Sequence, residues 1–114
     1  MRDIDILMRT AGIAAKKRDM RSFRVGAAGL RTDGVMVYAY NGAAPNKCAE
    51  IHAETRLCKK LGMGAIVWVA RATKDGQLAL AKPCANCQRT LRRRGVLKVI
   101  YSTGPDDYEV MILN

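Results

Sequence analysis

The sequence predicts an α/β fold, a three-layer α-β-α arrangement around a mixed five-stranded sheet whose last strand is antiparallel. Three observations support it. Segments with helical periodicity alternate with short β-rich runs in the order αββαβαββ, which is typical of one sheet flanked by helices. The 114 residues, 49% of them hydrophobic, suit a single domain spanning residues 1–114. The last two strands are separated only by residues 103–107, which is too short for a parallel return.

The first half of the chain is predicted to form a helix and a β-hairpin. Residues 2–17 form the helix because their apolar side chains recur at helical spacing. Residues 23–30 and 35–40 are β-rich runs on either side of Thr32-Asp33-Gly34, and Asp-Gly between two such runs is typical of a hairpin. The apolar helix face consists of Ile4, Leu7, Met8, Ala11, Ala14 and Ala15.

The middle of the chain predicts a second helix followed by a buried strand. The helix begins near Ile51 and ends at Gly62 or Gly64, since glycine is a usual helix terminator. Residues 64–72 form a central strand, because residues 66–69 are an unbroken apolar run.

The last third predicts one helix and two strands. The helix opens at Lys82-Pro83-Cys84 and runs to Arg94, and the strands are residues 96–102 and 108–113. Strands 64–72 and 96–102 are joined through a helix, so they should be parallel with a right-handed crossover.

Two short motifs carry the predicted chemistry. His52 and Glu54 stand at the start of the second helix, and Cys84 and Cys87 follow Pro83 at the start of the third. One imidazole and two thiolates without a fourth ligand nearby are the donor set of a catalytic Zn²⁺ site, because the open position can hold water. Glu54 is then predicted to carry protons and not to bind the metal.

The helix positions suit this chemistry. A helix N-terminus carries partial positive charge, which favours thiolate over thiol. The spacing of Cys84 and Cys87 puts both sulfurs on one side of a helical turn, and Pro83 is acceptable at a helix start. Zinc lowers the pKa of bound water to about 7. Glu54 would pass the proton of that water to the ring nitrogen of the substrate and help the amino group leave as ammonia.

One alternative is a closed zinc site without turnover. H-x-E alone and C-x-x-C alone are weak motifs, and Cys48 or Cys58 could supply a fourth ligand. The chain would then be a zinc-stabilised binding module. This hypothesis is less favoured because it leaves Glu54 and Pro83 without a role.

The motifs resemble a known group of enzymes. H-x-E followed by P-C-x-x-C is a signature of zinc deaminases that act on cytosine or adenine. Residues 39–45 with 51–54 resemble deoxycytidylate deaminases, as do 83–87 and 95–102, and residues 22–28 are similar to the first strand of free cytidine deaminases. The resemblance to the cytidine deaminase-like superfamily covers nearly the whole chain. It implies a hydrolytic deaminase that converts a cytosine nucleoside or nucleotide (dCMP, CMP, cytidine or deoxycytidine) to the uracil form.

The resemblance also implies substrate contacts and assembly. Asn41 would bind the sugar hydroxyl, the Ala53 backbone and the Cys84 N–H would meet the base, and Phe23 is a candidate for the pocket wall as well as for the core. Ala43 stands where free cytidine deaminases hold a sugar-binding Glu. The resembling families form homo-oligomers, and so we expect one here.

The charge favours phosphate-bearing partners. Lys and Arg number 20 against 10 Asp and Glu, a formal charge of +10, which attracts anions. Arg92-Arg93-Arg94, with Lys82, Arg89 and Lys98, keeps a polynucleotide deaminase open as an alternative. Aromatic residues for base stacking are only 5%, however, and cations at a helix end offset its dipole. A small cytosine nucleoside or nucleotide is therefore the preferred substrate.

The chain is predicted to be cytoplasmic, with no membrane partner. Charged residues interrupt residues 1–19, so no signal peptide is indicated. The longest apolar run, residues 65–70, is too short to span a bilayer. Four Cys without a secretion signal indicate reduced thiols and metal chemistry.

Overall fold

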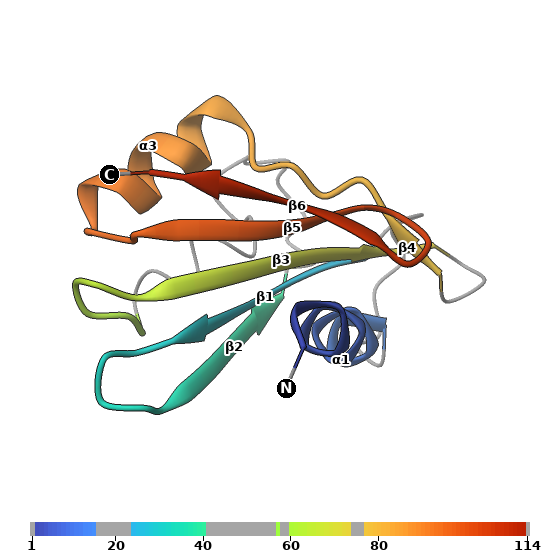
Figure 1. The fold of residues 1–114 in the computed structure, drawn as a ribbon, viewed down its shortest axis with the longest axis horizontal. Coiled ribbons are helices and arrows are strands. Elements are labelled where there is room, and N and C mark those ends of the chain that lie inside the picture. Colours follow the sequence, from blue (N-terminus) through green and yellow to red (C-terminus); the bar gives the residue numbers. More distant parts are fainter. Residues whose placement is uncertain (1, 16–23, 41–56, 58–59, 74–76, 114) are drawn as a thin grey trace, which may run out of the picture.

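The computed structural model describes residues 2–15, 24–40, 57, 60–73 and 77–113. These residues form one mixed sheet with helices against it (Figure 1). The strands lie in the order β2-β1-β3-β5-β6, and β4 pairs with β3. The elements are α1 (Asp3–Ala15), β1 (Arg24–Leu30), β2 (Met36–Tyr40), β3 (Ile66–Ala72), β4 (Leu78–Ala79), α3 (Ala85–Arg93), β5 (Lys98–Gly104) and β6 (Asp107–Ile112).

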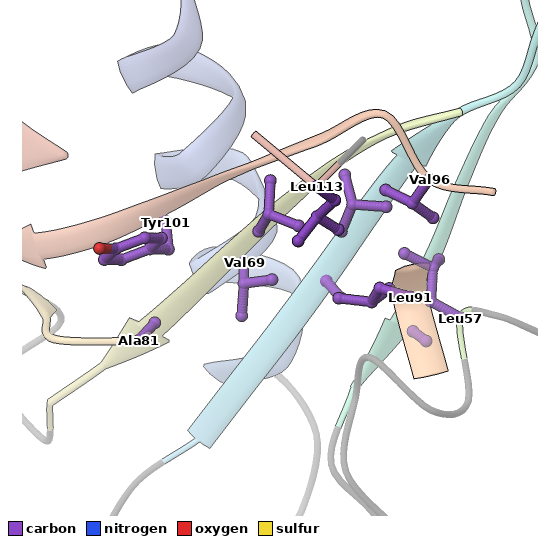
Figure 2. Close-up of a cluster of buried hydrophobic side chains, with 11 residues drawn as sticks. Leu57, Val69, Ala81, Leu91, Val96, Tyr101 and Leu113 are labelled. Carbon is purple, nitrogen blue, oxygen red and sulfur yellow. The ribbon is translucent and has the colours of Figure 1, made fainter. Parts of the chain in front are cut away.

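Alternating residues of the strands face two separate apolar clusters. Val67 and Val69 of β3 belong to one cluster, which also contains Leu91 of α3 and is called the α3-face cluster (Figure 2). Trp68 and Ala70 belong to the other, which contains Leu7 and Ala11 of α1 and is called the α1-face cluster. Because successive side chains of a strand point to opposite faces, the two helices cover opposite sides of the sheet. The predicted three-layer α/β fold is confirmed.

The predicted hairpin between β1 and β2 is also confirmed. The two strands are antiparallel, with Leu30 opposite Met36. Gly34 has a φ of 88°, a left-handed conformation that suits glycine. The Asp33 carboxylate accepts the Val35 N–H at 3.1 Å, and the Arg31 N–H donates to the Val35 carbonyl at 3.0 Å, so the Asp-Gly pair closes the turn.

The strand directions at the other end of the sheet follow the prediction. β3 and β5 are parallel from Ile66↔Lys98 to Val69↔Tyr101. β6 runs antiparallel to β5, because the short turn between them permits no other return.

The sheet contains one strand that the sequence did not predict. β4 is two residues long and pairs antiparallel with the end of β3, with Ala79 opposite Arg71. It takes the place beside β3 after the β3–β5 pairing ends at Val69↔Tyr101. A two-residue strand has no periodicity, so only tertiary contacts define it.

Several predicted boundaries were wrong by one to three residues. α3 begins at Ala85 with Cys84 as its N-cap, so the predicted opening residues Lys82, Pro83 and Cys84 precede the helix. Val96 and Leu97 precede β5: the Val96 N–H donates to the Leu91 carbonyl at 3.0 Å and the Leu97 N–H to the Ala65 carbonyl at 2.9 Å. β5 instead continues to Gly104, because its end pairs with the start of β6.

The second predicted helix lies mostly outside the described residues. Leu57 is helical and fully buried in the α3-face cluster. Lys60 already lies in a turn, with its N–H donating to the Leu57 carbonyl at 2.8 Å, so the helix does not extend to Gly62 or Gly64. Within the described part of the chain, no helix is long and apolar enough to cross a membrane.

Candidate functional site

The structure describes two of the predicted site residues, Cys84 and Cys87. The other five, Phe23, Asn41, His52, Ala53 and Glu54, lie outside the described residues. The structure therefore describes the α3 half of the site, and the half that contains His52 and Glu54 is a prediction from the sequence.

Both thiols lie at the N-terminus of α3. Cys84 is the N-cap, with an extended backbone (φ −69°, ψ 167°), and its carbonyl accepts the Gln88 N–H at 2.9 Å. Cys87 lies in the first turn and is only 2% exposed, whereas Cys84 is exposed. One cysteine is thus exposed at the surface while the other is held inside the protein.

The N-terminus of α3 has no acidic side chain and is held by a side-chain hydrogen bond. The first turn of α3 contains no acidic residue, so the partial positive charge of the helix N-terminus is not offset from within the helix. The Gln88 side-chain amide donates to the carbonyl of buried Pro83 at 2.8 Å, which fixes the chain entering the helix.

A buried serine holds the segment that leads to α3. The Ser102 hydroxyl donates to the Ala79 carbonyl at 2.6 Å and accepts the Arg71 N–H at 3.3 Å. The Ser102 carbonyl accepts the Ala81 N–H at 2.9 Å. Ser102 is fully buried, so it joins β3, β4 and β5 where the sheet divides, and it anchors the approach to Pro83 and Cys84.

We expect Ser102→Ala to lower the free energy of unfolding by about 1–3 kcal/mol, because it leaves two part-buried backbone groups, the Arg71 N–H and the Ala79 carbonyl, without the hydroxyl that bonds them. Urea unfolding followed by circular dichroism measures the change. Thr90→Ala is the matched control, since the Thr90 hydroxyl bonds a carbonyl of its own helix at an exposed position. An equal loss of stability in the two variants would contradict the role assigned to Ser102.

Tyr101 belongs to the α3-face cluster and makes a side-chain hydrogen bond to β6. The hydroxyl of buried Tyr101 donates to the Glu109 carboxylate at 2.7 Å. This hydrogen bond, followed by burial and the negative charge of Glu109, raises the pKa of Tyr101. The phenol therefore stays protonated near neutral pH, and it acts as a hydrogen-bond donor and not as a base.

Two cavities open elsewhere, on the α1 side of the sheet. One of about 330 Å³ is lined by Met8, Gly12, Leu78 and Asp106, among others. Another of about 720 Å³ lies beside Arg2, Met8 and Tyr108. Neither is lined by Cys84 or Cys87, so they are not the substrate pocket of the predicted site.

The donor chemistry at α3 fits zinc. Two thiols three residues apart at one helix N-terminus can supply two of the three ligands of a catalytic zinc ion. No group of three His, Cys, Asp or Glu side chains suited to a metal occurs among the residues that the structure describes, which do not include His52.

Two structural features of this region do not follow from the sequence pattern. The residue pattern predicts Ser102 only as the end of a strand and Arg71 only as part of one. Each is a polar residue that interrupts or ends an apolar strand. Such a pattern indicates a residue with specific partners, because buried polar groups are almost always hydrogen-bonded.

The comparisons with known proteins agree with the fold. The family model for the "cytidine and deoxycytidylate deaminase zinc-binding region" matches residues 1–103. The chain is similar to the solved cytidine deaminase from Burkholderia pseudomallei, with a TM-score of 0.62 and 24% identity over 96% of this chain and 91% of that one. It is similar to that from Mycobacterium leprae, with a TM-score of 0.60 and 23% identity over 93% and 91%.

The cytidine deaminase from Mycobacterium tuberculosis gives a TM-score of 0.58 and 24% identity over 92% of this chain and 90% of that one. At these identities the solved structures establish the fold alone. The search of curated proteins gave no match.

Proposed function

The chain belongs to the cytidine and deoxycytidylate deaminase family, and from this premise we propose that it deaminates a cytosine nucleotide or nucleoside at one zinc ion. The observation that carries the proposal is the pair of thiols at the N-terminus of α3, one buried and one exposed. Water adds to C4 of the base, the C4–N bond breaks, and the products are the uracil form and ammonia.

His52, Cys84 and Cys87 would hold the metal, which when bound supplies a Lewis acid that makes water acidic near neutral pH. Glu54 would take the proton of the attacking water and deliver it to the ring nitrogen N3. It would next transfer a proton to the departing amino group. The N-terminus of α3 would stabilise the negative charge that develops beside Cys84.

We propose that the substrate carries a 5′-phosphate. The formal charge of +10 raises the local concentration of anions. Ala43 occupies the position where the resembling nucleoside deaminases hold a sugar-binding carboxylate, so a repulsion against phosphate is absent from that position.

We expect CMP or dCMP to be turned over at least as efficiently as the matching nucleoside, with the preference shrinking as salt rises, because salt screens exposed charges. Ammonia release measures kcat/KM for cytidine, deoxycytidine, CMP, dCMP and adenosine at two salt concentrations. Adenosine should be poor. A preference for unphosphorylated cytidine that salt does not change would contradict the proposal.

A polynucleotide substrate is the second candidate, because Arg89, Arg93 and Arg94 are exposed on or beside α3. Arg92 has a structural role, since its Nε donates to the Leu113 carbonyl at 3.0 Å. Adding a cytosine-containing single strand to the same assay tests this candidate. Efficient action on the strand with none on monomers would replace the nucleotide proposal.

We also propose that the chain assembles with copies of itself through β6. This strand is at the edge of the sheet, and Tyr108, Val110 and Ile112 lie on the face that β6 shares with Ile100. Val110 is 49% and Ile112 62% exposed, although they belong to an otherwise buried sheet face. An exposed apolar edge strand is a template for pairing with another strand.

A second copy suits this edge. If two β6 strands pair antiparallel about Val110, Tyr108 meets Ile112 of the other copy, which is a favourable cross-strand pair. In this arrangement Asp106 and Asp107 of one copy approach the Ile112 end of β6 in the other copy. Lys98, on the neighbouring strand β5, is opposite Ile112 at that end. The two ends are therefore complementary in charge.

We expect the protein to be oligomeric at micromolar concentration and Val110→Asp to reduce its mass, because the variant places like charges opposite each other. Light scattering measures the mass. Val35→Asp is the control, because Val35 is 47% exposed in the hairpin turn, far from β6 in the sheet. A monomer mass for the unmodified chain would contradict the proposal. The predicted cytoplasmic location stays a prediction.

A further inference from the structure

Arg71 is a cation in an apolar part of the sheet. Val67 and Val69 of β3 lie in the α3-face cluster, and Trp68 and Ala70 lie in the α1-face cluster. By this alternation Arg71 occupies the next position on the α3 face. Its side chain is half-buried, and its Nε atom is shielded from solvent.

The position of Arg71 coincides with a division of the sheet. The pairing of β3 with β5 ends at Val69↔Tyr101, and beyond it Arg71 lies between Val25 of β1 and Ala79 of β4. The parallel strands thus diverge at their carboxyl ends. Ligands of open α/β sheets bind in crevices at such places.

This end of the sheet also leads to the predicted metal ligands. The chain passes from Ala79 through Ala81, which lies in the α3-face cluster with Val69 and Tyr101 (Figure 2), to Cys84. Ser102 fixes this route through its bonds to the Arg71 N–H and the Ala79 carbonyl. The backbone of Arg71 is therefore held by the same serine that positions the approach to α3.

The guanidinium suits an anionic ligand. Its N–H donors form a planar fork that can contact several acceptors at once and that matches the oxygens of a phosphate. Val25 and Ala79, its neighbours across the sheet, have apolar side chains, and the Nε atom of Arg71 is shielded from solvent. A charge in such surroundings attracts an anion more strongly than the same charge on the open surface.

We propose that Arg71 binds the 5′-phosphate of the substrate and thereby sets the preference for nucleotide over nucleoside. This inference rests on the proposed function. It differs from a general effect of the net charge, because Arg71 lies on the face where α3 begins, whereas Arg89 and Arg93 are exposed on α3 itself.

The test compares Arg71→Gln, Arg71→Lys and the control Arg93→Gln, which removes the same charge from the exposed surface of α3. We expect Arg71→Gln to lower kcat/KM for CMP or dCMP by about 10- to 100-fold, the range for one charge-assisted hydrogen bond. Its kcat/KM for the nucleoside should stay within about 3-fold, because the nucleoside has no phosphate for Arg71 to bind. A change of about 3-fold corresponds to a free energy below that of one hydrogen bond. Arg71→Lys should retain part of the nucleotide preference, and Arg93→Gln all of it.

Binding of the product gives a readout that does not need turnover. Calorimetry with UMP and uridine should show weaker UMP binding in Arg71→Gln and unchanged uridine binding. Equal losses for nucleotide and nucleoside would show that Arg71 only supports the fold, and would overturn the inference. Arg71→Gln could fail to fold, and the other two variants then decide. The inference would be overturned if the folded Arg71→Lys variant kept the full preference for nucleotide over nucleoside while Arg93→Gln lost that preference. Failure of the proposed function can be told apart from failure of this inference. In that case the unmodified chain would release ammonia from neither the nucleotide nor the nucleoside.

Discussion

Glu54→Gln is expected to abolish ammonia release from the cytosine substrate while leaving the zinc content unchanged. The change removes the proposed proton carrier and none of the proposed metal ligands, and it preserves the size of the side chain. General acid–base groups contribute about 10²- to 10⁴-fold to the rate. Steady-state ammonia release and metal analysis of the same preparation measure both effects.

Glu109→Gln is the matched control for this variant. The amide oxygen of the introduced glutamine can still accept the Tyr101 hydroxyl that the Glu109 carboxylate accepts at 2.7 Å, so turnover should change little. Near-normal turnover in Glu54→Gln would remove Glu54 from the mechanism. Loss of zinc in that variant would instead make Glu54 a metal ligand.

The second large effect is expected from the two cysteines of α3. Cys84→Ala, Cys87→Ala and the double variant should lose both activity and the bound zinc, about one ion per chain, because each change removes at least one of the three proposed protein ligands. They should also melt at a lower temperature than the zinc-loaded chain, since an ion that binds only the folded state stabilises it. Metal analysis and thermal unfolding with and without a chelator measure these changes.

Cys48→Ala and Cys58→Ala separate the catalytic site from the closed one. Both variants should keep zinc and activity if three ligands suffice. Zinc loss in either variant, together with an unmodified chain that releases no ammonia, would favour the zinc-stabilised binding module. Stoichiometric zinc retained in the Cys84→Ala, Cys87→Ala double variant would contradict the assignment of the ligands.

The sequence alone predicted the features that depend on local patterns. Apolar spacing identified α1, and the Asp33-Gly34 pair identified the β1–β2 hairpin, since both signals lie within a few consecutive residues. The short connection before Asp107 required β6 to be antiparallel. The P-C-x-x-C motif placed two thiols at a helix start, where Cys84 is the N-cap.

The tertiary structure decided the features that depend on residues far apart in the chain. The Ser102 hydroxyl bonds groups 23 and 31 residues away, and no local pattern in the sequence specifies such partners. β4 exists only because the β3–β5 pairing ends at Val69↔Tyr101 and leaves the end of β3 to pair with Leu78 and Ala79. Arg71 reads in the sequence as one polar residue in an apolar run. Its place where the sheet divides, on the face where α3 begins, arises from strand pairing, because hydrogen bonds between strands fix positions that periodicity along one strand does not determine.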